Sequence, residues 1–325
     1  MGRLERKAVA AQMKEILSTG HYLAGGKQKE EVSLNRFGHG MKAWSKAVAY
    51  SPEKLAALLQ GEGFKKLFTE AAAKGQDCHF LLTKHGSFAS GLLEPCPEEL
   101  PPKEQPVLVM NFANAHRPGG GFWNGALAQE ESLCRESTLI ASLESRTASA
   151  MYKYNHQYGG ACDSHYMLLS PYVLVISDGK GVEPEHFFNA PKLAAVATVA
   201  APNRKGRARL VPQPELDKEM KDRLRLMLAM AAVNGYKKLV LGAWGCGAFG
   251  NDPYKVAGFF KELFLEEQFA LLFSEVEFAI LGGGPNYDAF QAVFEGILSE
   301  GRAEKDHTPH KVRRKDWEAL PMPEK

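Results

Sequence analysis

Two adjacent carboxylates, Glu130 and Glu131, are the residues of this sequence best suited to carry out chemistry. Three consecutive glycines, 119–121, precede them in the sequence. Seven residues and then Gln129 lie between these glycines and the two carboxylates. A carboxyl group can protonate a leaving oxygen or activate a water, which is general acid–base catalysis. Neighbouring residues of a helix project about 100° apart, so we expect that the two side chains cannot face the same atom. One is expected to reach a substrate oxygen and the other to hold a neighbouring hydroxyl.

A strand, a loop and a helix are expected to position these carboxylates. The apolar run 106–112 predicts a buried strand, and Asn111 and Asn114 lie at its end. The glycines that follow permit a positive φ or the close approach of a ligand, at the edge of the sheet where open α/β proteins bind ligands. Acids in a first helical turn often only complement the helix dipole, and a glycine-rich turn can be only a turn. Their combination in one strand–loop–helix segment favours a functional site.

A second glycine-rich segment, 242–250, follows the apolar run 237–244 and precedes a helix. Asp252 is suited to cap that helix and Pro253 to occupy its first position. Glycines leave backbone N–H groups open to a diphosphate. The segment also matches the G-x-G-x-x-G pattern of dinucleotide-binding oxidoreductases. That alternative is disfavoured because the helix begins after the glycines and the next apolar run, 276–282, ends in glycine rather than in an acid.

The sequence around both features resembles one family of enzymes. NFANAHRPGGGF and QEESLCRESTL are similar to the signature of the microbial-type poly(ADP-ribose) glycohydrolases, and GAWGCGAFGND resembles their diphosphate-binding loop. The resemblance extends over about residues 5–295. It implies a three-layer α/β/α macrodomain with a mixed sheet and an N-terminal helical extension. It also implies hydrolysis of the ribose–ribose O-glycosidic bonds of poly(ADP-ribose) at chain ends, without a cofactor, which would reverse ADP-ribosylation.

The resemblance also assigns roles to individual residues. Glu131 would be the general acid that protonates the leaving ribose oxygen and then the base that activates a water, while Glu130 would orient the leaving ribose. The ribose-binding residues would be Asn114, Gly120, Gly121, Gln129 and Phe249, and the diphosphate-binding residues Gly245, Cys246, Gly247, Ala248 and Gly250. On the sequence alone, an ordinary core aromatic is the favoured explanation of Phe249. Cys246 is not expected to be a nucleophile, because no histidine lies near it in the sequence.

Net charge, cysteines and histidines limit the partners of the chain. Its 325 residues carry a net charge of +2, unlike the basic field of a non-specific nucleic-acid binder. Five scattered cysteines and ten histidines form no C-x-x-C or H-E-x-x-H pattern, so neither a disulfide framework nor a metal site is expected. No apolar run is long enough to span a membrane, and the charged start is unlike a signal peptide. We therefore expect a cytoplasmic or, in a eukaryote, nuclear monomer that binds poly(ADP-ribose) or ADP-ribosylated proteins, releases ADP-ribose, and binds neither membranes nor nucleic acid.

The chain is expected to contain a helical extension at 1–75, a macrodomain-like catalytic domain at 76–300 and a charged tail at 301–325. In the extension, helical spacing of apolar residues predicts helices at 3–17 and 51–74, the second divided near Gly61. In the domain, short apolar runs alternate with helical patterns, which indicates an α/β fold. The predicted strands are 79–82, 106–112, 172–176, 196–201, 237–244 and 276–282. The predicted helices are 129–145, 215–233, 252–266 and 286–299.

A non-catalytic module that only binds ADP-ribose is the main alternative function. Both classes of protein need a phosphate-binding loop, so that loop does not separate them. A binding module has no need for two carboxylates beside the terminal ribose, and Glu130 and Glu131 therefore favour the enzyme. The sequence leaves open whether internal bonds are also cut, whether the protein-linked ADP-ribose is removed, and which residues contact adenine.

Overall fold

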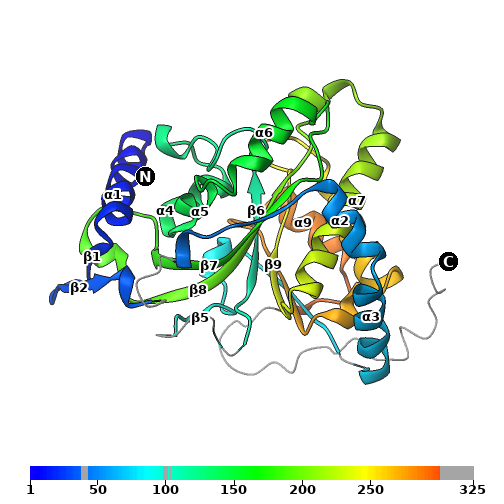
Figure 1. Ribbon diagram of the computed structural model, residues 1–325, viewed down its shortest axis with the longest axis horizontal. Helices are drawn as coiled ribbons and strands as arrows, with labels where there is room; N and C mark the ends of the chain where they lie inside the picture. Colours follow the sequence, from blue (N-terminus) through cyan, green and yellow to red (C-terminus); the bar gives the residue numbers. More distant parts are fainter. Residues whose placement is uncertain (38–42, 76, 98–101, 103, 301–325) are drawn as a thin grey trace. The chain divides into compact units, whose positions relative to one another are not determined.

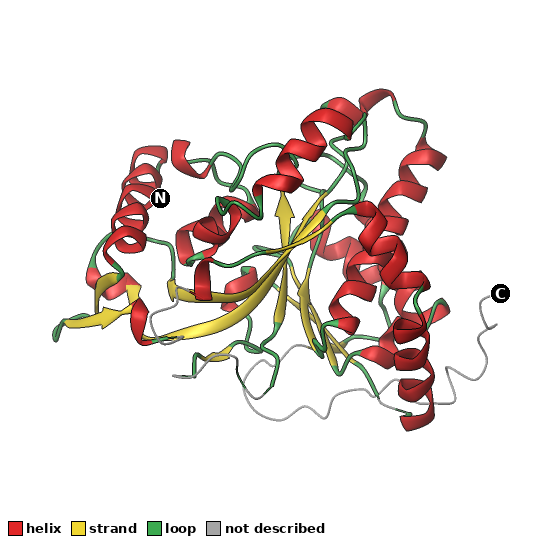
Figure 2. Ribbon diagram, in the orientation of Figure 1, coloured by secondary structure: helices red, strands yellow, loops and turns green. Residues whose placement is uncertain are grey.

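The computed structural model describes residues 1–37, 43–75, 77–97, 102 and 104–300, and the predicted tail at 301–325 lies outside these residues. Figures 1 and 2 show the helices and strands that these residues form. The chain divides into two compact units, each assembled from separate segments. Unit 1 comprises Met1–Tyr50, Gly91–Gly159 and Tyr166–Ala200, and unit 2 comprises Ser51–Ser90, Gly160–His165 and Ala201–Lys325. The predicted domain limits after residues 75 and 300 stay predictions.

The sheet of unit 1 combines parallel and antiparallel strands (Figure 1). Its strands are β3 (Val48–Tyr50), β5 (Glu94–Pro95), β6 (Leu108–Ala113), β7 (Met167–Ser177) and β8 (Phe187–Ala200). β6 runs parallel to β8, whereas β7 is antiparallel to both β8 and β3, and β5 is antiparallel to β8. All but one of the six β6 residues are buried, because an apolar strand covered on both faces keeps its side chains from water. The predicted buried strand at 106–112 is confirmed.

The described residues of unit 1 form the α-helices α1 (Arg3–Thr19), α4 (Gln129–Glu136), α5 (Leu139–Leu143) and α6 (Ser149–Tyr158). The prediction of one helix at 129–145 is wrong. Ser137 is extended between α4 and α5, and Thr138 pairs with β7: its N–H donates to the Leu174 carbonyl, and its hydroxyl accepts from the Leu174 N–H, both at 3.0 Å. This pairing with β7 stops the helix, and neither it nor α6 was predicted.

The N-terminal part of unit 1 begins with α1, which confirms the helix predicted at 3–17. Gly20 ends it in the left-handed conformation, with a φ of 78°, as glycine commonly does after a helix. The hairpin of β1 (His21–Ala24) and β2 (Glu30–Ser33) follows. The Tyr22 hydroxyl donates to the Phe188 carbonyl in β8 at 2.9 Å, so the hairpin is attached to the sheet of unit 1.

The strands of unit 2 lie in the order β11-β4-β10-β9, and every described pair among them is parallel. The strands are β4 (His79–Thr83), β9 (Lys238–Leu241), β10 (Glu275–Ala279) and β11 (Ser299–Glu300). The helices are α2 (Pro52–Gln60), α3 (Glu62–Lys74), α7 (Gln213–Val233), α8 (Pro253–Lys261) and α9 (Pro285–Val293). Gly61 separates α2 from α3, as predicted, and the Ser51 hydroxyl caps α2 by accepting from the Lys54 N–H.

Phenylalanines form the centre of unit 2. Phe80 of β4 and Phe278 of β10 contact aromatic rings from α8, α9 and the turns that follow these helices. Phe260, Phe278 and Phe294 are fully buried, and offset or tilted ring pairs of this kind add to the free energy gained from burial. The strands of unit 2 are thus held by aromatic packing against the helices that follow them.

The secondary structure agrees with most of the predicted elements and differs at their ends. Each of the six predicted strands is present, although β7 and β8 begin several residues earlier than predicted. The helix predicted at 252–266 is α8 followed by a π-helical turn, Glu262–Glu266. The helix predicted at 286–299 ends at Val293, and residues 299–300 form β11. The α/β class with a mixed sheet is confirmed.

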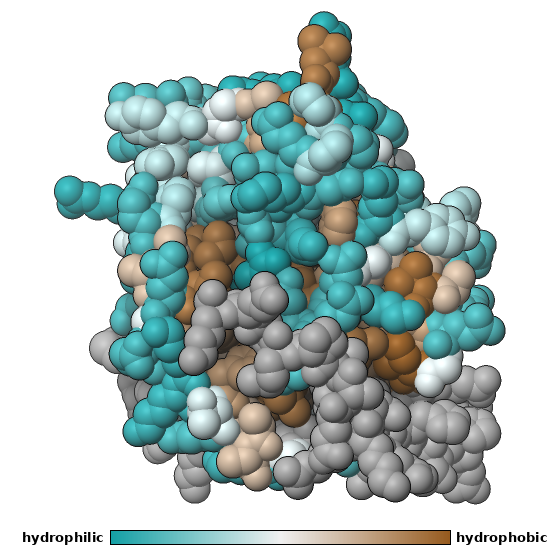
Figure 3. Space-filling model, turned by 90° about the vertical axis from the view of Figure 1, so that its right-hand side faces the viewer, coloured by the Kyte–Doolittle hydropathy of each residue, from teal (hydrophilic) through white to brown (hydrophobic). Residues whose placement is uncertain are grey.

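Hydrophilic residues form most of the described surface on the face drawn in Figure 3, and hydrophobic residues appear there in smaller patches. Among the helices formed by the described residues, none has both the length and the apolar character that crossing a bilayer requires.

Candidate active site

The polypeptide turns sharply where β6 ends. The side-chain oxygen of Asn114 accepts hydrogen bonds from the N–H groups of His116 and Arg117, at 2.9 and 3.0 Å. Asparagine favours such turns because its side chain imitates a backbone carbonyl. The turn directs the chain into the three glycines at 119–121, which we call the triglycine turn.

Each glycine of the triglycine turn lies where a side chain would collide with a neighbour. Gly119 has a φ of 65°, and a Cβ atom placed on it would lie 2.6 Å from Cδ1 of Ile140. Gly120 has a φ of 59°, and its Cβ would lie 2.5 Å from Oε1 of Glu131 and 3.0 Å from Oε2 of Glu130. On Gly121 the Cβ would lie 2.7 Å from the Cβ of Ala126.

The two carboxylates therefore meet at one point of the backbone, Gly120. The expectation that adjacent helical residues cannot face the same atom is wrong for this pair. The reason is that a glutamate has three rotatable bonds, so its carboxylate can return toward a point that its Cβ does not face. The missing side chain of Gly120 provides the space for both groups.

Glu130 is held by donors on both of its oxygens. Its exposed fraction is 2%, Oε2 accepts from the Asn114 N–H at 2.8 Å, and Oε1 accepts from Nδ2 of Asn111 at 3.2 Å. Burial raises the pKa of Glu130 to about 8; hydrogen bonds from Asn114, Asn111 and Gly119 oppose this, and the charge of Glu131 adds to it. In the folded protein the Glu130 carboxyl therefore keeps its proton to a higher pH than a glutamate in water does.

Glu131 has one oxygen held and one oxygen available. Oε1 accepts from the Gly121 N–H at 2.8 Å. The whole residue is only 6% exposed, and its Oε2 is buried without a hydrogen-bond partner among the described residues. A buried oxygen without a partner costs free energy, and a hydroxyl or water that donated to it would remove that cost.

Gln129 fixes the start of α4 against the strand. Its side-chain oxygen accepts from the Phe112 N–H at 2.9 Å, and its nitrogen donates to the Met110 carbonyl at 2.8 Å. The amide thus pairs with β6 as a neighbouring strand would. This positioning role was not predicted, and the ribose contact assigned to Gln129 stays a prediction.

Arginines from two helices hold the seven residues between the triglycine turn and Gln129. From α1, Arg3 donates to the Asn124 carbonyl at 3.0 Å and Arg6 donates to the Gly125 carbonyl at 2.8 Å. From α4, Arg135 donates to the Ala126 carbonyl at 2.8 Å. The contacts of Arg3 and Arg6 were not predicted, because more than a hundred residues separate these arginines from the loop.

Asn111 is a further residue of the site, and its role was not predicted. Its Nδ2 donates to Glu130 and also lies 3.3 Å from the hydroxyl of Thr198, the residue that faces it in β8. Both Asn111 and Thr198 are completely buried. The sequence did contain a signal, namely a polar residue within each of two apolar runs, because buried polar groups need hydrogen-bond partners.

The second glycine-rich segment, residues 242–250 of unit 2, is called the glycine loop from here on. Gly245 and Gly250 have φ values of 73° and 72°, a conformation that glycine adopts without strain. Asn251 lies beneath the loop with an exposed fraction of 5%. Its backbone N–H and its Nδ2 both donate to the Gly245 carbonyl at 3.1 Å, and Nδ2 also donates to the Pro202 carbonyl at 2.9 Å.

Some backbone N–H groups of the glycine loop donate hydrogen bonds within the protein, and others do not. Those of Cys246 and Gly250 donate to the carbonyls of Ala243 and Gly247, at 3.1 and 3.3 Å, so the diphosphate contacts assigned to these two residues stay predictions. The N–H groups of Gly247, Ala248 and Phe249 have no acceptor among the described residues. A Cβ placed on Gly247 would meet no atom within 4 Å. Three successive open N–H groups beside free space can bind an anion.

The surroundings of Phe249 and Cys246 in the glycine loop each exclude one possible role. Phe249 is only half-buried and is not part of the core, so its explanation as an ordinary core aromatic is wrong. Burial raises the pKa of the Cys246 thiol to about 12, and the charge of Asp252 adds to this. A protonated thiol is a weak nucleophile, which supports the expectation that Cys246 does not act as one.

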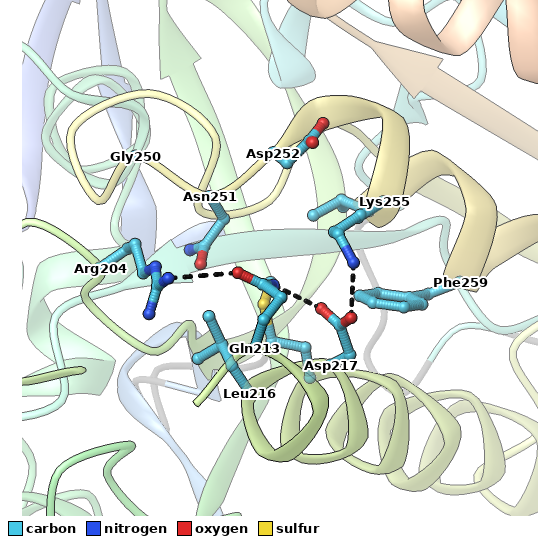
Figure 4. A pocket seen from close by; sticks show the side chains of 11 residues that line it. Arg204, Gln213, Leu216, Asp217, Gly250, Asn251, Asp252, Lys255 and Phe259 are labelled. Atoms are coloured by element: carbon cyan, nitrogen blue, oxygen red, sulfur yellow. Dashed lines mark hydrogen bonds and ion pairs between the residues drawn. The ribbon is translucent and has the colours of Figure 1, made fainter. Parts of the chain in front are cut away.

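A pocket of about 100 Å³ lies behind the glycine loop, between that loop and the starts of α7 and α8 (Figure 4). A chain of polar contacts crosses it. Arg204 donates to Oε1 of Gln213 at 3.2 Å, Gln213 donates to Asp217 at 2.6 Å, and Lys255 pairs with Asp217 at 2.6 Å. These contacts connect the segment before α7 to α8 and so support the loop from behind.

The predicted site residues fall into two groups. Asn114, Gly120, Gly121, Gln129 and the two carboxylates lie together in unit 1, and residues 245–250 lie in unit 2. Within the part of the chain that the structure describes, all five cysteines are free, and no three His, Cys, Asp or Glu residues are grouped so that they could hold a metal ion.

The sequence and the fold are similar to known glycohydrolases. The family model for the catalytic domain of microbial-type PARG, poly(ADP-ribose) glycohydrolase, matches residues 10–178. The glycohydrolase of Thermomonospora curvata is 35% identical with a TM-score of 0.74, and the match covers 89% of this chain and 99% of that one. The glycohydrolase of Deinococcus radiodurans, solved in complex with ADP-ribose, is 30% identical with a TM-score of 0.63, covering 78% and 96%. A comparison with curated proteins gave no match.

Proposed function

This chain belongs to the microbial-type poly(ADP-ribose) glycohydrolase family, and we propose that Glu131 carries the hydrolysis. The fold is macrodomain-like, and the protein is a glycosidase that hydrolyses poly(ADP-ribose). The roles of its individual residues and its action at chain ends go beyond family membership. They are proposals that rest on the geometry of unit 1 and of the glycine loop.

The single observation that carries the proposal is the unpartnered Oε2 of Glu131. Donors of the protein already occupy both oxygens of Glu130, so its task is to shape the site and to hold a hydroxyl of the leaving ribose. Glu131 has one oxygen, Oε2, that no donor among the described residues occupies. Its other oxygen is fixed by the Gly121 N–H, which sets the direction in which the free oxygen points.

The proposed reaction has two steps at the anomeric carbon. Glu131 gives a proton to the ribose oxygen that leaves as the glycosidic C–O bond breaks, through an oxocarbenium-like transition state. A water then adds to the anomeric carbon, and its proton passes to Glu131, which regains its starting state. The products are free ADP-ribose and a polymer shortened by one ADP-ribose moiety.

Release of ADP-ribose tests this function directly. The protein is incubated with auto-modified poly(ADP-ribose) polymerase, and the soluble products are separated by chromatography. We expect free ADP-ribose to accumulate with time. A protein that binds the polymer but releases nothing would contradict the proposal and would favour the non-catalytic binding module.

For the glycine loop we propose that the N–H groups of Gly247 and Ala248 bind the diphosphate of ADP-ribose. Backbone N–H groups bind phosphate oxygens without a side-chain charge, and both residues are exposed. Gly245 and Asn251 hold the loop in place from below. A contact between Phe249 and ribose, and one between Asn114 and ribose, stay predictions.

Gly247→Ala is expected to weaken ADP-ribose binding about tenfold or more without destabilising the protein. The φ of Gly247 is not positive and its added Cβ meets no protein atom, so the fold can accept it. The new methyl group would instead occupy the space through which a phosphate oxygen approaches the N–H groups. Calorimetry with ADP-ribose and thermal unfolding are the two measurements. Gly63→Ala on α3, which also meets no atom, is the control, and equal affinities in both variants would contradict the assignment.

The pKa of Glu130 predicts how stability depends on pH. Burial raises this pKa from 4.5 to about 8 in the folded protein, so between these values the folded state binds more protons than the unfolded state. The free energy of unfolding should therefore fall as the pH rises from about 4.5 to about 8, by at most about 1.4 kcal/mol per pH unit. Glu130→Gln cannot titrate and is expected to lose this part of the slope. Denaturant unfolding across that pH range tests it, and identical slopes in wild type and variant would contradict the raised pKa.

A further inference from the structure

A group of basic residues lies beside the glycine loop of unit 2. Arg204, Lys205, Arg207 and Arg209 place four cations within six residues, although the whole chain has a net charge of only +2. The N–H of Lys205 donates to the Phe249 carbonyl at 3.1 Å. This hydrogen bond attaches the basic segment, residues 204–209, to the loop that offers its N–H groups to a diphosphate.

Arg204 differs from the other three because it points inward. It donates to the Val211 carbonyl at 2.8 Å and to Oε1 of Gln213 at 3.2 Å, inside the pocket behind the loop (Figure 4). It thereby fixes the short 3₁₀ turn Arg207–Leu210 that carries the remaining arginines. Its role is structural, and its substitution would disturb the whole segment.

Lys205, Arg207 and Arg209 are exposed. The Lys205 ammonium lies 3.4 Å from the Gly247 carbonyl, and its stem covers Gly250, where an added Cβ would lie 2.7 Å from Cε. Arg207 donates to the Gly160 carbonyl at 2.8 Å. Within the described residues, no carboxylate is at ion-pair distance from Lys205 or Arg209.

The carboxylates that line the neighbouring pocket have other partners. Asp217 pairs with Lys255 and accepts from Gln213, each at 2.6 Å. Asp252 caps α8 by accepting from the Tyr254 N–H at 2.8 Å. Neither is paired with Lys205 or Arg209, so the positive charge of these two residues extends outward from the edge of the glycine loop.

We propose that Lys205, Arg207 and Arg209 form a second phosphate-binding surface, for the diphosphate of the ADP-ribose moiety next to the one in the glycine loop. This rests on the proposed diphosphate role of that loop. Poly(ADP-ribose) repeats a diphosphate in every moiety, so a chain with one diphosphate in the loop presents the next one to an adjoining surface. The segment is attached to the glycine loop, which favours a ligand that binds both at once. Poly(ADP-ribose) with a diphosphate in the loop is such a ligand, whereas the phosphates of a nucleic acid do not need a diphosphate site beside them.

Arg209→Gln tests the surface, because Arg209 does not contact the glycine loop in the described structure. Binding is measured in the Glu131→Gln background, by calorimetry with ADP-ribose and by fluorescence anisotropy with labelled polymer of about ten moieties. We expect polymer binding to weaken about 3- to 10-fold at low salt, with its salt dependence reduced by roughly one counterion, and ADP-ribose binding to stay unchanged. Lys205→Gln should weaken both ligands, because its ammonium lies on the loop. Lys66→Gln on α3, an exposed cation of the same unit, should weaken neither.

Three results would overturn the proposal. Arg209→Gln could leave polymer affinity and its salt dependence unchanged, or it could weaken ADP-ribose and polymer equally. A single-stranded oligonucleotide of equal charge could displace the polymer as well as unlabelled polymer does, which would indicate a general polyanion surface. The ADP-ribose release assay with the wild-type protein reports separately on the proposed function, so the failure of one is distinguishable from the failure of the other.

Discussion

Glu131→Gln is expected to lower kcat for poly(ADP-ribose) hydrolysis by about 10²- to 10⁴-fold, the range that one general acid–base group contributes. An amide can neither give the leaving ribose oxygen its proton nor take one from the attacking water. Its side-chain oxygen can still accept from the Gly121 N–H, as Oε1 of Glu131 does, so the triglycine turn should keep its shape. ADP-ribose affinity should therefore change little. Rates of ADP-ribose release and calorimetric affinities, measured on the same preparations, check both halves of this expectation.

Glu130→Gln is the matched comparison, because the two residues are adjacent and both are buried. Its effect on kcat should be smaller, about tenfold, since Glu130 acts through position rather than through proton transfer. Asn111 can turn its amide so that Oδ1, which has no partner among the described residues, accepts from the introduced amide nitrogen. A loss of kcat in Glu130→Gln as large as in Glu131→Gln, or wild-type turnover in Glu131→Gln, would contradict the assigned roles.

The parts of the site that the sequence predicts are the ones made by neighbours along the chain. Gly120 and Glu131 are eleven residues apart in one strand–loop–helix segment. Both loops owe their shape to glycines, which can be identified directly in the sequence. Buried apolar runs likewise predicted the strands, because continuous burial leaves few alternatives for a short apolar segment. Asn111 was visible as well, although only the fold shows that its partner is Thr198.

The parts that the sequence does not predict depend on contacts between distant segments. Arg3 and Arg6 hold the loop before Gln129 from a helix at the start of the chain. Thr138 leaves its helical pattern because β7 offers it hydrogen bonds, and local propensity contains no information about that strand. The meeting of both carboxylates at Gly120 is of the same kind, since it follows from side-chain torsions that the hydrogen bonds of the folded site select.

The glycines of the two loops also differ in what fills the place of their missing side chains. At Gly120 the protein itself uses the space, because two carboxylates lie there. At Gly247 the space is empty, which is what a ligand-facing backbone requires. A methyl group at Gly120 should therefore displace the carboxylates of the protein, whereas one at Gly247 should obstruct the ligand. The two substitutions thus test separately how the site is built and how the ligand binds to it.

Gly120→Ala is accordingly expected to lower kcat about 100-fold or more and to destabilise the fold by about 1–3 kcal/mol. Part of the destabilisation comes from the φ of 59°, which costs an L-residue about 1–2 kcal/mol. The rest comes from a Cβ 2.5 Å from Oε1 of Glu131, a contact that can be relieved only if the carboxylate moves. A displacement of about 1 Å at a catalytic group commonly costs about 10² in rate.

Gly160→Ala separates these two causes, because Gly160 has a φ of 63° and an added Cβ there meets no atom within 4 Å. In denaturant unfolding, Gly160→Ala should lose only the free energy that the positive φ costs, and its kcat should be unchanged. Gly120→Ala should show a larger loss of stability and nearly lose its turnover. Similar kcat values in the two variants would mean that the carboxylates tolerate the methyl group, and the close approach of Glu130 and Glu131 to Gly120 would then not be what places the free oxygen of Glu131.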